Sequence, residues 1–410
     1  MRKFNLYTTC ITVVLGTVLY CEILVDYIKL VQVKAKQKIM KQLRSLILAD
    51  THLLGPLHGH WLDKLYREWH MHHAFQVAMT LLRPEIVFVL GDLFDEGDLV
   101  NGKEFNQYVQ RFRSLFHTPA GTSVISAVGN HDVGFHYKMH PYFTERFEAS
   151  FNNTGVHLYT FKEVHFVFIN SMAMENDRCG FCARAQLELQ KIASSLDCLR
   201  NTYCANEGIR AQYGSYSRPV MMQHFPTYRI SDKVCKVHDS PAIERYREKW
   251  EVLSKESTDM LGKLLHPRLA FAGHSHHYCQ FTNRFGVDEY TVASFNWRNK
   301  INPSVLLAIF TPDEQAVSKC NLPDQNTNYM IYMLTFSTCI LLILIIFIKT
   351  KQDSITVQSE RFKLELLILP SLLYLKALIT KFIRQNLNLE IIAYSIFYKS
   401  CLYKTLSMLK

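Results

Sequence analysis

Short and almost continuously apolar runs recur through the middle of this chain, and each ends at a small or polar residue. The runs occupy residues 45–49, 86–91, 123–129, 219–223 and 269–273. Apolar stretches of this length are typical of parallel β-strands that are covered on both faces. The pattern therefore predicts a buried sheet whose strands come from widely separated parts of the chain.

Longer segments between these runs carry apolar residues at helical spacing. They predict helices at Leu62–Leu82, Phe105–Phe116, Ala183–Leu199 and Ser254–Leu265. The first ends just before Pro84, where a helix is expected to stop. Because strands and helices alternate, we expect an α/β layered domain, with bounds at about residues 44–311.

Two further segments are apolar enough to cross a membrane, which takes about 20 residues. Asn5–Val25 is uncharged until Glu22, and residues 329–348 carry no charge. A cleaved signal peptide is the alternative for the first segment, although no small-residue cleavage site follows it. We predict an N-terminal anchor over 1–28, a linker over 29–43 and a transmembrane helix over 328–348.

The tail over 349–410 combines apolar stretches with interspersed Lys and Arg and a Pro370. This pattern predicts one or two amphipathic helices on a membrane surface. A poorly ordered or spuriously translated extension is the alternative. The tail contains no cluster of metal-ligating or acid–base residues.

Composition narrows the functional classes. The chain has 410 residues, is 48% hydrophobic and carries a net charge of +10. Half of that excess follows Thr350, and no basic block is interleaved with aromatic residues. We therefore expect a substantial core and no nucleic-acid partner.

The side of the membrane follows from charge and cysteine placement. Lys349 and Lys351 after the second span put the C-terminus in the cytosol and the middle region in the lumen, whereas charges around the first span point the other way. The sequon Asn152-Asn153-Thr154 also favours a lumenal region. Seven cysteines lie between the spans, as suits an oxidising lumen: Cys179, Cys182, Cys198, Cys204, Cys235, Cys279 and Cys320.

The Cys179-Gly-Phe-Cys182 segment is compatible with a zinc half-site, a redox motif or a disulfide. No second CxxC follows, so a zinc ribbon is not expected. We favour a structural disulfide, with Cys198 and Cys204 as further candidates. The connectivity stays open.

Oxygen and nitrogen metal ligands follow the five apolar runs. Because the carboxyl ends of parallel strands converge, we expect one site built from all five segments. No cysteine belongs to the set, and such ligands suit Mn, Fe or Zn. The predicted ligands are Asp50, His52, Asp92, Asn130, His224, His274 and His276.

The set predicts a two-metal centre for phosphoester hydrolysis, because two divalent ions about 3.5–4 Å apart activate water and neutralise phosphoryl charge. Asp92 is the expected bridge between the ions. Asp50, His52 and His276 would complete one shell, and Asn130, His224 and His274 the other.

His131 follows a predicted ligand and is the expected catalytic residue, protonating the leaving group or touching a phosphoryl oxygen. Support of neighbouring ligands is its alternative role. We expect Asp132 to orient His131, and Asp95 and His136 to lie just outside the ligands. The histidines at 58, 60, 70, 72 and 73 are expected to pack or to face solvent. For His58 and His60, lining the substrate cleft is the alternative.

These blocks resemble the calcineurin-like metallophosphoesterase superfamily. Its pattern DxH…GD…GNHD…H…GHxH is matched by Asp50/His52, Gly91/Asp92, Gly129–Asp132, His224 and Gly273–His276. The resemblance implies a four-layer α/β/β/α sandwich, here with N- and C-terminal transmembrane helices, and two metal ions at the strand ends.

ADTHLLG, GHWLDKLYREW, GDLFDEG, GNHDVGFHY, CGFC and FNWRN resemble the membrane-anchored branch that remodels glycosylphosphatidylinositol (GPI) anchors. That resemblance implies removal of a side-branch ethanolamine phosphate from the GPI glycan, most often with Mn²⁺. It implies GPI-anchored proteins as substrates, the bilayer and cargo receptors as partners, and a lumenal domain at endoplasmic reticulum (ER) exit sites, the ER–Golgi intermediate compartment and the cis-Golgi.

The chain departs from this branch after the second span, where about sixty residues end in SMLK instead of a paired-lysine retrieval signal. Localisation therefore stays less constrained than the chemistry. A lumenal metallophosphatase for another phosphoester and a non-catalytic trafficking scaffold are the alternative functions.

Overall fold

The structure is a computed structural model that describes residues 2–31, 42–153, 155–175, 177, 179–201, 206–239 and 245–353. The chain divides into two compact units, one of residues 36–322 and one of the terminal segments 1–35 and 323–410. Most of the predicted linker over 29–43 and tail over 349–410 lies outside the described residues. Each unit is described separately.

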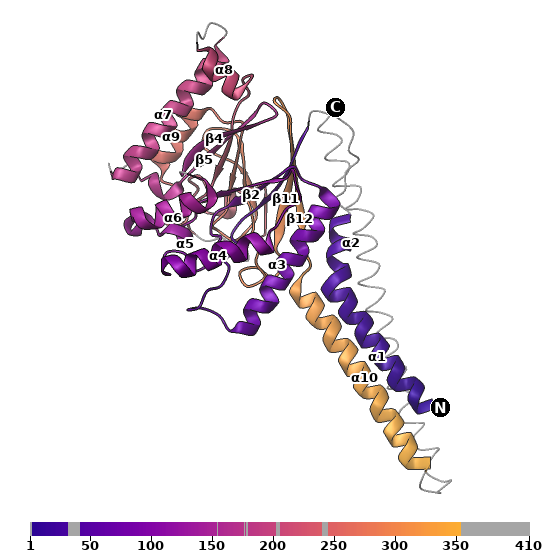
Figure 1. Cartoon of the computed structure of the whole chain (residues 1–410). Helices are drawn as coiled ribbons and strands as arrows, with labels where there is room; N and C mark the ends of the chain where they lie inside the picture. The colour runs from indigo at the N-terminus through magenta and orange to yellow at the C-terminus, as the bar shows by residue number, and fades with distance from the viewer. Residues whose placement is uncertain are drawn as a thin grey trace. The chain divides into compact units, whose positions relative to one another are not determined.

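The larger unit contains two β-sheets (Figure 1). The five-stranded sheet has the order β12-β11-β1-β2-β3. Its strands β1, β2 and β3 are parallel, whereas β11 pairs antiparallel with both β1 and β12. The strands are β12 (Gln315–Asn321), β11 (Ser304–Phe310), β1 (Leu43–Leu48), β2 (Ile86–Leu90) and β3 (Ser123–Ala127).

The seven-stranded sheet has the order β4-β5-β6-β8-β10-β9-β7, and its central strands from β5 to β10 are parallel. The hairpin β4–β5 and the strands β9 and β7 form its antiparallel edges. The strands are β4 (Val156–Phe161), β5 (Val164–Ile169), β6 (Val220–Gln223), β8 (Leu269–Ala272), β10 (Asp288–Thr291), β9 (Cys279–Thr282) and β7 (Val237–His238).

The two sheets pack against each other through aromatic side chains. Phe88 of β2 lies 4.8 Å from Phe166 of β5, and Phe166 lies 5.2 Å from Phe310 of β11, between ring centroids. All three are buried in one apolar cluster that draws on both sheets. The core therefore lies between the sheets, and it fixes the strand ends of both sheets relative to each other.

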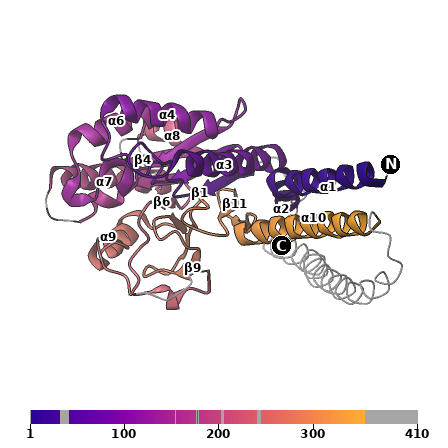
Figure 2. The same cartoon turned by 90° about the horizontal axis from the view of Figure 1, so that it is seen from below.

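Helices flank this sandwich. In Figure 1, α3 and α4 lie below the sheets, and α7 and α9 lie beside β4 and β5; Figure 2 shows the same layers from below. This is the predicted four-layer α/β/β/α arrangement. The helices are α3 (Trp61–Leu82), α4 (Gly102–Leu115), α5 (Asn130–Val133), α6 (Pro141–Phe151), α7 (Gly180–Arg200), α8 (Glu207–Tyr213) and α9 (Lys255–Leu265).

The five apolar runs are strands β1, β2, β3, β6 and β8, and the four predicted helices are α3, α4, α7 and α9. These predictions are confirmed. The first sheet also continues through β12 to Asn321, ten residues past the predicted boundary at 311. β12 belongs to the unit because it pairs along the full length of β11.

The smaller unit is a helical pair. Its first half comprises α1 (Arg2–Leu19), a π-helical turn (Tyr20–Leu24) and α2 (Val25–Val31), and its second half is α10 (Gln325–Asp353). Within this unit Thr17 Oγ1 lies 3.3 Å from Thr335 Oγ1. The segments Cys10–Lys29 and Gln325–Ile348 are each long and apolar enough to cross a membrane, as the sequence predicted for both ends of the domain.

Candidate metal centre

The seven predicted ligands lie just beyond strand ends, six in loops and Asn130 at the start of α5. Because the runs that precede them are parallel strands within their sheets, these ends point the same way. Asp50 and His52 follow β1, Asp92 follows β2, Asn130 follows β3, His224 follows β6, and His274 and His276 follow β8.

Five of these residues adopt a left-handed backbone, which is uncommon outside glycine. Their φ angles are 54° for Asp50, 40° for His52, 50° for Asp92, 71° for His274 and 58° for His276. Such strain clusters at functional sites, where the surrounding fold holds it in place. The sharp turn after each strand aims the side chain back toward the strand ends.

One cluster is formed by Asp50, His52, Asp92 and His276, whose ligand atoms all lie within 4.8 Å of one another. His52 Nε2 lies 3.5 Å from Asp92 Oδ2 and 3.0 Å from His276 Nε2. His276 Nε2 lies 3.8 Å from Asp50 Oδ1. Two imidazole nitrogens and two carboxylates thus converge on one point.

A second cluster is formed by Asp92, His224 and His274, again within 4.8 Å. His224 Nε2 lies 3.2 Å from Asp92 Oδ2 and 3.0 Å from Asn130 Oδ1. The amide oxygen of Asn130 therefore joins this group. The division into two groups is the one that the sequence predicted.

Asp92 is the residue that the two clusters share, so one carboxylate faces both groups. Asp50, Asp92 and His224 are at most 1% exposed, whereas the His276 side chain is 32% exposed. The donors are carboxylate oxygen, amide oxygen and imidazole nitrogen, a set that fits two divalent cations of the Mn, Fe or Zn type.

The buried carboxylates Asp50 and Asp92 would be stabilised by additional positive charge. Burial and the neighbouring Asp92 raise the pKa of Asp50 to about 8. Burial also acts to raise the pKa of Asp92, but His224 and His131 outweigh it and hold that pKa well below its usual range. Two carboxylates crowded together without full counter-charge form a site that cations would stabilise.

The imidazoles are held by their second nitrogen, as metal-ligating histidines usually are. His224 Nδ1 lies 2.7 Å from the Leu90 carbonyl oxygen, and His274 Nε2 lies 2.7 Å from that of Trp250. His52 Nδ1 lies 3.2 Å from Asp95 Oδ1. Burial, with His224 nearby, lowers the pKa of His274 to about 3, so its ring is neutral at physiological pH.

His131 lies beside the first cluster, with its ring centroid 4.8 Å from that of His52. Its Nδ1 lies 2.9 Å from the Asp95 carbonyl oxygen, and its backbone N–H donates to Asp92 Oδ1 at 2.9 Å. The prediction that Asp132 orients His131 is wrong. Asp132 instead accepts hydrogen bonds from the backbone of Leu93, Phe94 and Gly129, tying the loops after β2 and β3 together.

His136 does not lie just outside the ligands as predicted. Its Nε2 lies 2.7 Å from Asp177 Oδ2, and its Nδ1 lies 2.9 Å from the Met172 carbonyl oxygen. The chain turns at Gly134, which ends α5 with a φ of 90°, and His136 follows that turn. His136 belongs to a different group of side chains.

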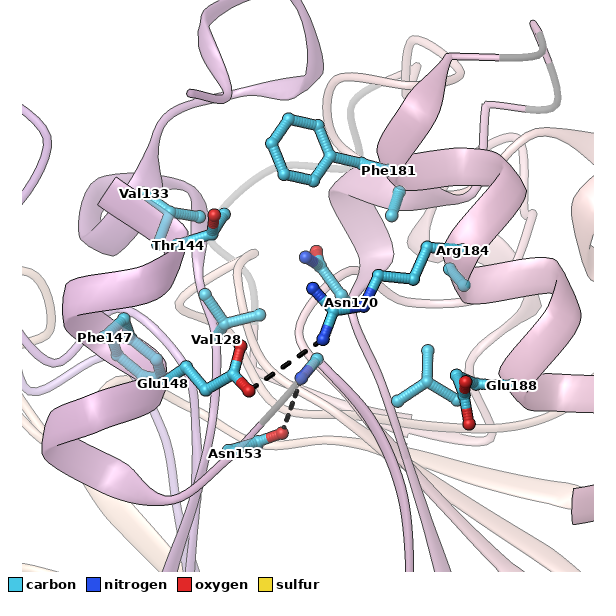
Figure 3. A pocket seen from close by; sticks show the side chains of 14 residues that line it. Val128, Val133, Thr144, Phe147, Glu148, Asn153, Asn170, Phe181, Arg184 and Glu188 are labelled. Carbon is cyan, nitrogen blue, oxygen red and sulfur yellow. Dashed lines mark hydrogen bonds and ion pairs between the residues drawn. The ribbon is translucent and has the colours of Figure 1, made fainter. Parts of the chain in front are cut away.

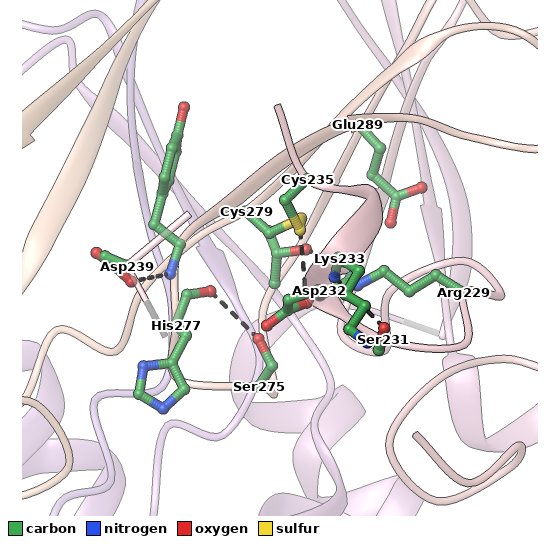
Figure 4. The surroundings of a disulfide bond; sticks show 12 residues. Arg229, Ser231, Asp232, Lys233, Cys235, Asp239, Ser275, His277, Cys279 and Glu289 are labelled. Atoms are coloured by element: carbon green, nitrogen blue, oxygen red, sulfur yellow. Dashed lines mark hydrogen bonds and ion pairs between the residues drawn. A yellow bond between two sulfur atoms is a disulfide. The ribbon is translucent and has the colours of Figure 1, made fainter. Parts of the chain in front are cut away.

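The disulfide predicted for Cys179 and Cys182 is also wrong, because both are free thiols. Cys198 is disulfide-bonded, and Cys204 lies outside the described residues. A further disulfide joins Cys235 to Cys279 (Figure 4). This disulfide ties the segment that leads into the short strand β7 to the start of β9, shortly after the GHSH segment.

The other histidines divide as follows. His58 Nδ1 lies 3.4 Å from Asp95 Oδ2, so this side chain does border the site. His60 does not, because it caps α3 by accepting from the Leu62 N–H at 3.3 Å. His70 packs edge-on against Tyr66, as expected for a packing residue.

Three supporting residues were not predicted. Glu96 is fully buried and accepts from the Leu57 backbone at 3.1 Å and from Tyr108 OH at 3.0 Å, which holds the loop after Asp50. Asn296 donates to the Thr51 carbonyl oxygen at 2.8 Å. Arg298 Nη1 lies 3.3 Å from Asp95 Oδ2. The GDLFDEG and FNWRN blocks contain these residues and were the available signal.

A cavity between α6 and α7 is not a second substrate site (Figure 3). It measures about 50 Å³ and is lined by Phe147, Asn153, Phe181 and Arg184 among others. Ligand pockets usually measure about 300–1,000 Å³. None of the seven predicted ligands lines it.

Residues 43–278 match the family described as calcineurin-like phosphoesterase. This match covers more than half of the chain, and the chain belongs to that family. It is a metal-dependent phosphoester hydrolase. The site described above lies almost wholly within the matched residues.

Within the family, the chain is 54% identical over 339 residues to the metallophosphoesterase 1 homolog of Drosophila melanogaster, covering 82% of this chain and 91% of the relative. It is 39% identical over 360 residues to metallophosphoesterase 1 of Ailuropoda melanoleuca, covering 84% and 90%. The Danio rerio protein of that name is 39% identical over 362 residues, covering 85% and 93%. These matches confirm the resemblance to the calcineurin-like metallophosphoesterase superfamily.

Proposed function

We propose that this chain is a membrane-anchored two-metal phosphodiesterase that removes a side-branch ethanolamine phosphate from the GPI glycan. The observation that carries the proposal is the pair of ligand clusters that share Asp92. The substrate follows from the sequence blocks that resemble the GPI-remodelling branch. The two apolar helices at the ends of the domain support a substrate that is itself held in the bilayer.

In this proposal Asp50, His52 and His276 would hold one divalent ion, Asn130, His224 and His274 would hold the other, and Asp92 would serve both. We favour Mn²⁺ because the resemblance to the GPI-remodelling branch implies it. Fe and Zn are the alternatives, since three oxygen ligands mixed with four imidazoles suit all three metals. When bound, the ions supply an activated water and positive charge at the phosphoryl oxygens.

The chain's own residues perform the remaining work. Water adds to phosphorus, the bond between phosphorus and the sugar oxygen breaks, and that oxygen takes up a proton. His131 is placed for this step, because the Asp95 carbonyl holds Nδ1 and leaves Nε2 as the free nitrogen of the ring. The products are a sugar hydroxyl and free ethanolamine phosphate.

Aromatic side chains beside the second cluster support a glycan substrate. The aromatic shelf consists of Phe135, Tyr137 and Trp250, with the Trp250 ring 5.3 Å from Phe135 and 5.6 Å from Tyr137. Tyr137 is 63% exposed and Trp250 43% exposed, although both are large and apolar. The Trp250 carbonyl contacts His274, so a sugar ring stacked on this shelf would lie next to the metal centre.

We also place the larger unit in the lumen of the early secretory pathway, at ER exit sites, the ER–Golgi intermediate compartment and the cis-Golgi. There the reaction would promote export of GPI-anchored proteins, with cargo receptors as candidate partners. The Cys235–Cys279 disulfide supports an oxidising compartment. Asn152, the sequon's acceptor, is exposed at the end of α6. Protection of this unit from protease in sealed microsomes would test the orientation.

The test of the substrate is mass analysis of GPI glycans from cells that lack the chain, rescued with the wild type, with Asp92→Asn or with Asp259→Asn. The last is a matched control, because Asp259 is a surface carboxylate paired with Arg284. We expect the wild type and the control to remove the side branch and Asp92→Asn to leave it. Unchanged ethanolamine phosphate in all three would refute the substrate and leave another lumenal phosphoester.

A further inference from the structure

Four metal-ligating side chains outside the two-metal centre meet at the start of α7. One nitrogen of His136, one carboxylate oxygen of Asp177 and the sulfur atoms of Cys179 and Cys182 all lie within 4.8 Å of one another. We call this group the thiol cluster. His136 comes from the loop after α5, and the other three come from the segment that leads into α7.

The two cysteines of the cluster are thiols, although disulfides form elsewhere in the same unit. Cys235 is joined to Cys279 and Cys198 is also disulfide-bonded, whereas Cys179 and Cys182 remain thiols. The Cys182 N–H donates to Cys179 Sγ at 3.0 Å. A backbone donor of this kind stabilises negative charge on sulfur, which a metal-bound thiolate carries.

The orientation of His136 also indicates a cation. Because Nδ1 faces the Met172 carbonyl at 2.9 Å, it is the nitrogen that carries the proton. A neutral ring then turns the lone pair of Nε2 toward Asp177 Oδ2, only 2.7 Å away. Two acceptors at that distance need positive charge, either from a second proton on the ring or from a metal ion. Metal-ligating histidines show this pattern, with one nitrogen donating to a carbonyl.

The spacing of the four atoms fits a small tetrahedral ion. Cys182 Sγ lies 3.3 Å from Asp177 Oδ1, and His136 Nε2 lies 2.7 Å from Asp177 Oδ2. Ligands of tetrahedral zinc lie about 3.3–3.8 Å from one another, given bonds of about 2.0–2.3 Å. The His136–Asp177 pair would therefore open by about half an ångström. Two thiolates with one imidazole favour zinc over the harder ions suited to the other centre.

We propose that His136, Asp177, Cys179 and Cys182 form a closed, structural zinc site. Binding would displace the two thiol protons to solvent and leave no open position for substrate. The site would fasten the chain that follows the GNHD block to α7. It therefore acts on the aromatic shelf through Phe135, the residue before His136, and leaves the chemistry to the two-metal centre.

The test is cobalt substitution of the full-length chain in detergent, after metal removal under reducing conditions. Co²⁺ bound by thiolate gives a sulfur-to-metal charge-transfer band in the near ultraviolet, and the two-metal centre cannot produce it because it contains no sulfur. We expect the band in the wild type, its loss in Cys182→Ser, and its retention in Cys320→Ser. Cys320 is a buried cysteine on β12 outside the thiol cluster and serves as the matched control.

A second variant keeps the proposal testable where loss of a thiol impairs folding. Asp177→Cys retains four ligands and adds a third thiolate, so the band should rise about 1.5-fold per bound ion. Zinc analysis of the untreated protein should find one ion that the Cys182→Ser variant lacks. A Cys179–Cys182 disulfide in peptide mass analysis, or an unchanged band in Cys182→Ser, would overturn the zinc site.

Discussion

The two-metal centre and the thiol cluster assemble ligands in different ways. The centre draws on five strand ends, and its carboxylates and His224 are almost fully buried. The thiol cluster uses two neighbouring segments, and its Asp177 side chain is 46% exposed. The two-metal centre is fixed by the sandwich core and tolerates a left-handed backbone at five ligands. The four residues of the thiol cluster, which come from a loop and a helix start, show no such backbone. Position within the fold thus separates a catalytic site from a structural one.

The largest expected effect is at the carboxylate that both clusters share. Asp92→Asn should lower kcat/KM by at least about 10³-fold, because several kcal/mol of charge stabilisation depend on both ions and each 1.36 kcal/mol is tenfold. A chromogenic phosphodiester provides the assay. Asp259→Asn should behave as wild type, and an Asp92→Asn variant with full turnover would contradict the shared site.

His131→Gln should reduce kcat by about 10²–10⁴-fold, the usual contribution of a general acid, while both ions stay bound. Metal analysis alongside the kinetics separates this role from ligation. His157→Gln, a change at an exposed histidine of β4, is the control. Loss of an ion together with activity would instead make His131 a supporting residue of the metal site.

Substitutions in the thiol cluster should lower the thermal stability of the larger unit more than they lower turnover. Cys182→Ser should lower the thermal midpoint of the larger unit by about 5–10 °C, which corresponds to a few kcal/mol at this size. Turnover of the small diester should fall less than tenfold. A large loss of kcat with an unchanged thermal midpoint would instead place the thiol cluster in the catalytic site. It would contradict the distinction between a catalytic two-metal centre and a structural thiol cluster.

The smallest effect concerns the aromatic shelf. Trp250→Ala should raise KM for a glycan phosphodiester by about tenfold, since an aromatic contact contributes about 0.5–1.5 kcal/mol. The small chromogenic diester should be unaffected. Trp69→Ala is the control, because Trp69 is also exposed but stacks on His73 of α3. Equal effects of Trp250→Ala on both substrates would count against sugar stacking.

Much of this architecture is legible in the sequence because both the core strands and the ligands repeat a local pattern. The nearly continuous apolar runs coincide with β1, β2, β3, β6 and β8, and each is followed by its ligands. The hairpin β4–β5 was not predicted, because it turns at Lys162 and Glu163, which adopt positive φ without the usual Asn or Gly. Its strands lack the signal that marks a hairpin.

The errors at the site share a physical cause. Asp132 and His136 were assigned by their distance in sequence from His131, but Asp132 turns inward to three backbone N–H groups and His136 lies beyond a loop. The thiols of Cys179 and Cys182 were assigned to a disulfide because His136, which lies beside them in the fold, is more than forty residues away in the sequence. Side-chain direction depends on tertiary packing, which local pattern does not encode.

The most direct test of the account is manganese binding to the metal-stripped full-length chain, followed by electron paramagnetic resonance. Mn²⁺ is too hard an ion to favour the thiol cluster, so the signal reports on the two-metal centre. We predict two bound ions with exchange-coupled spectra in the wild type, and loss of the coupling in Asp92→Asn. A single ion per wild-type chain, or two ions whose spectra show no coupling, would contradict a carboxylate shared between two metals.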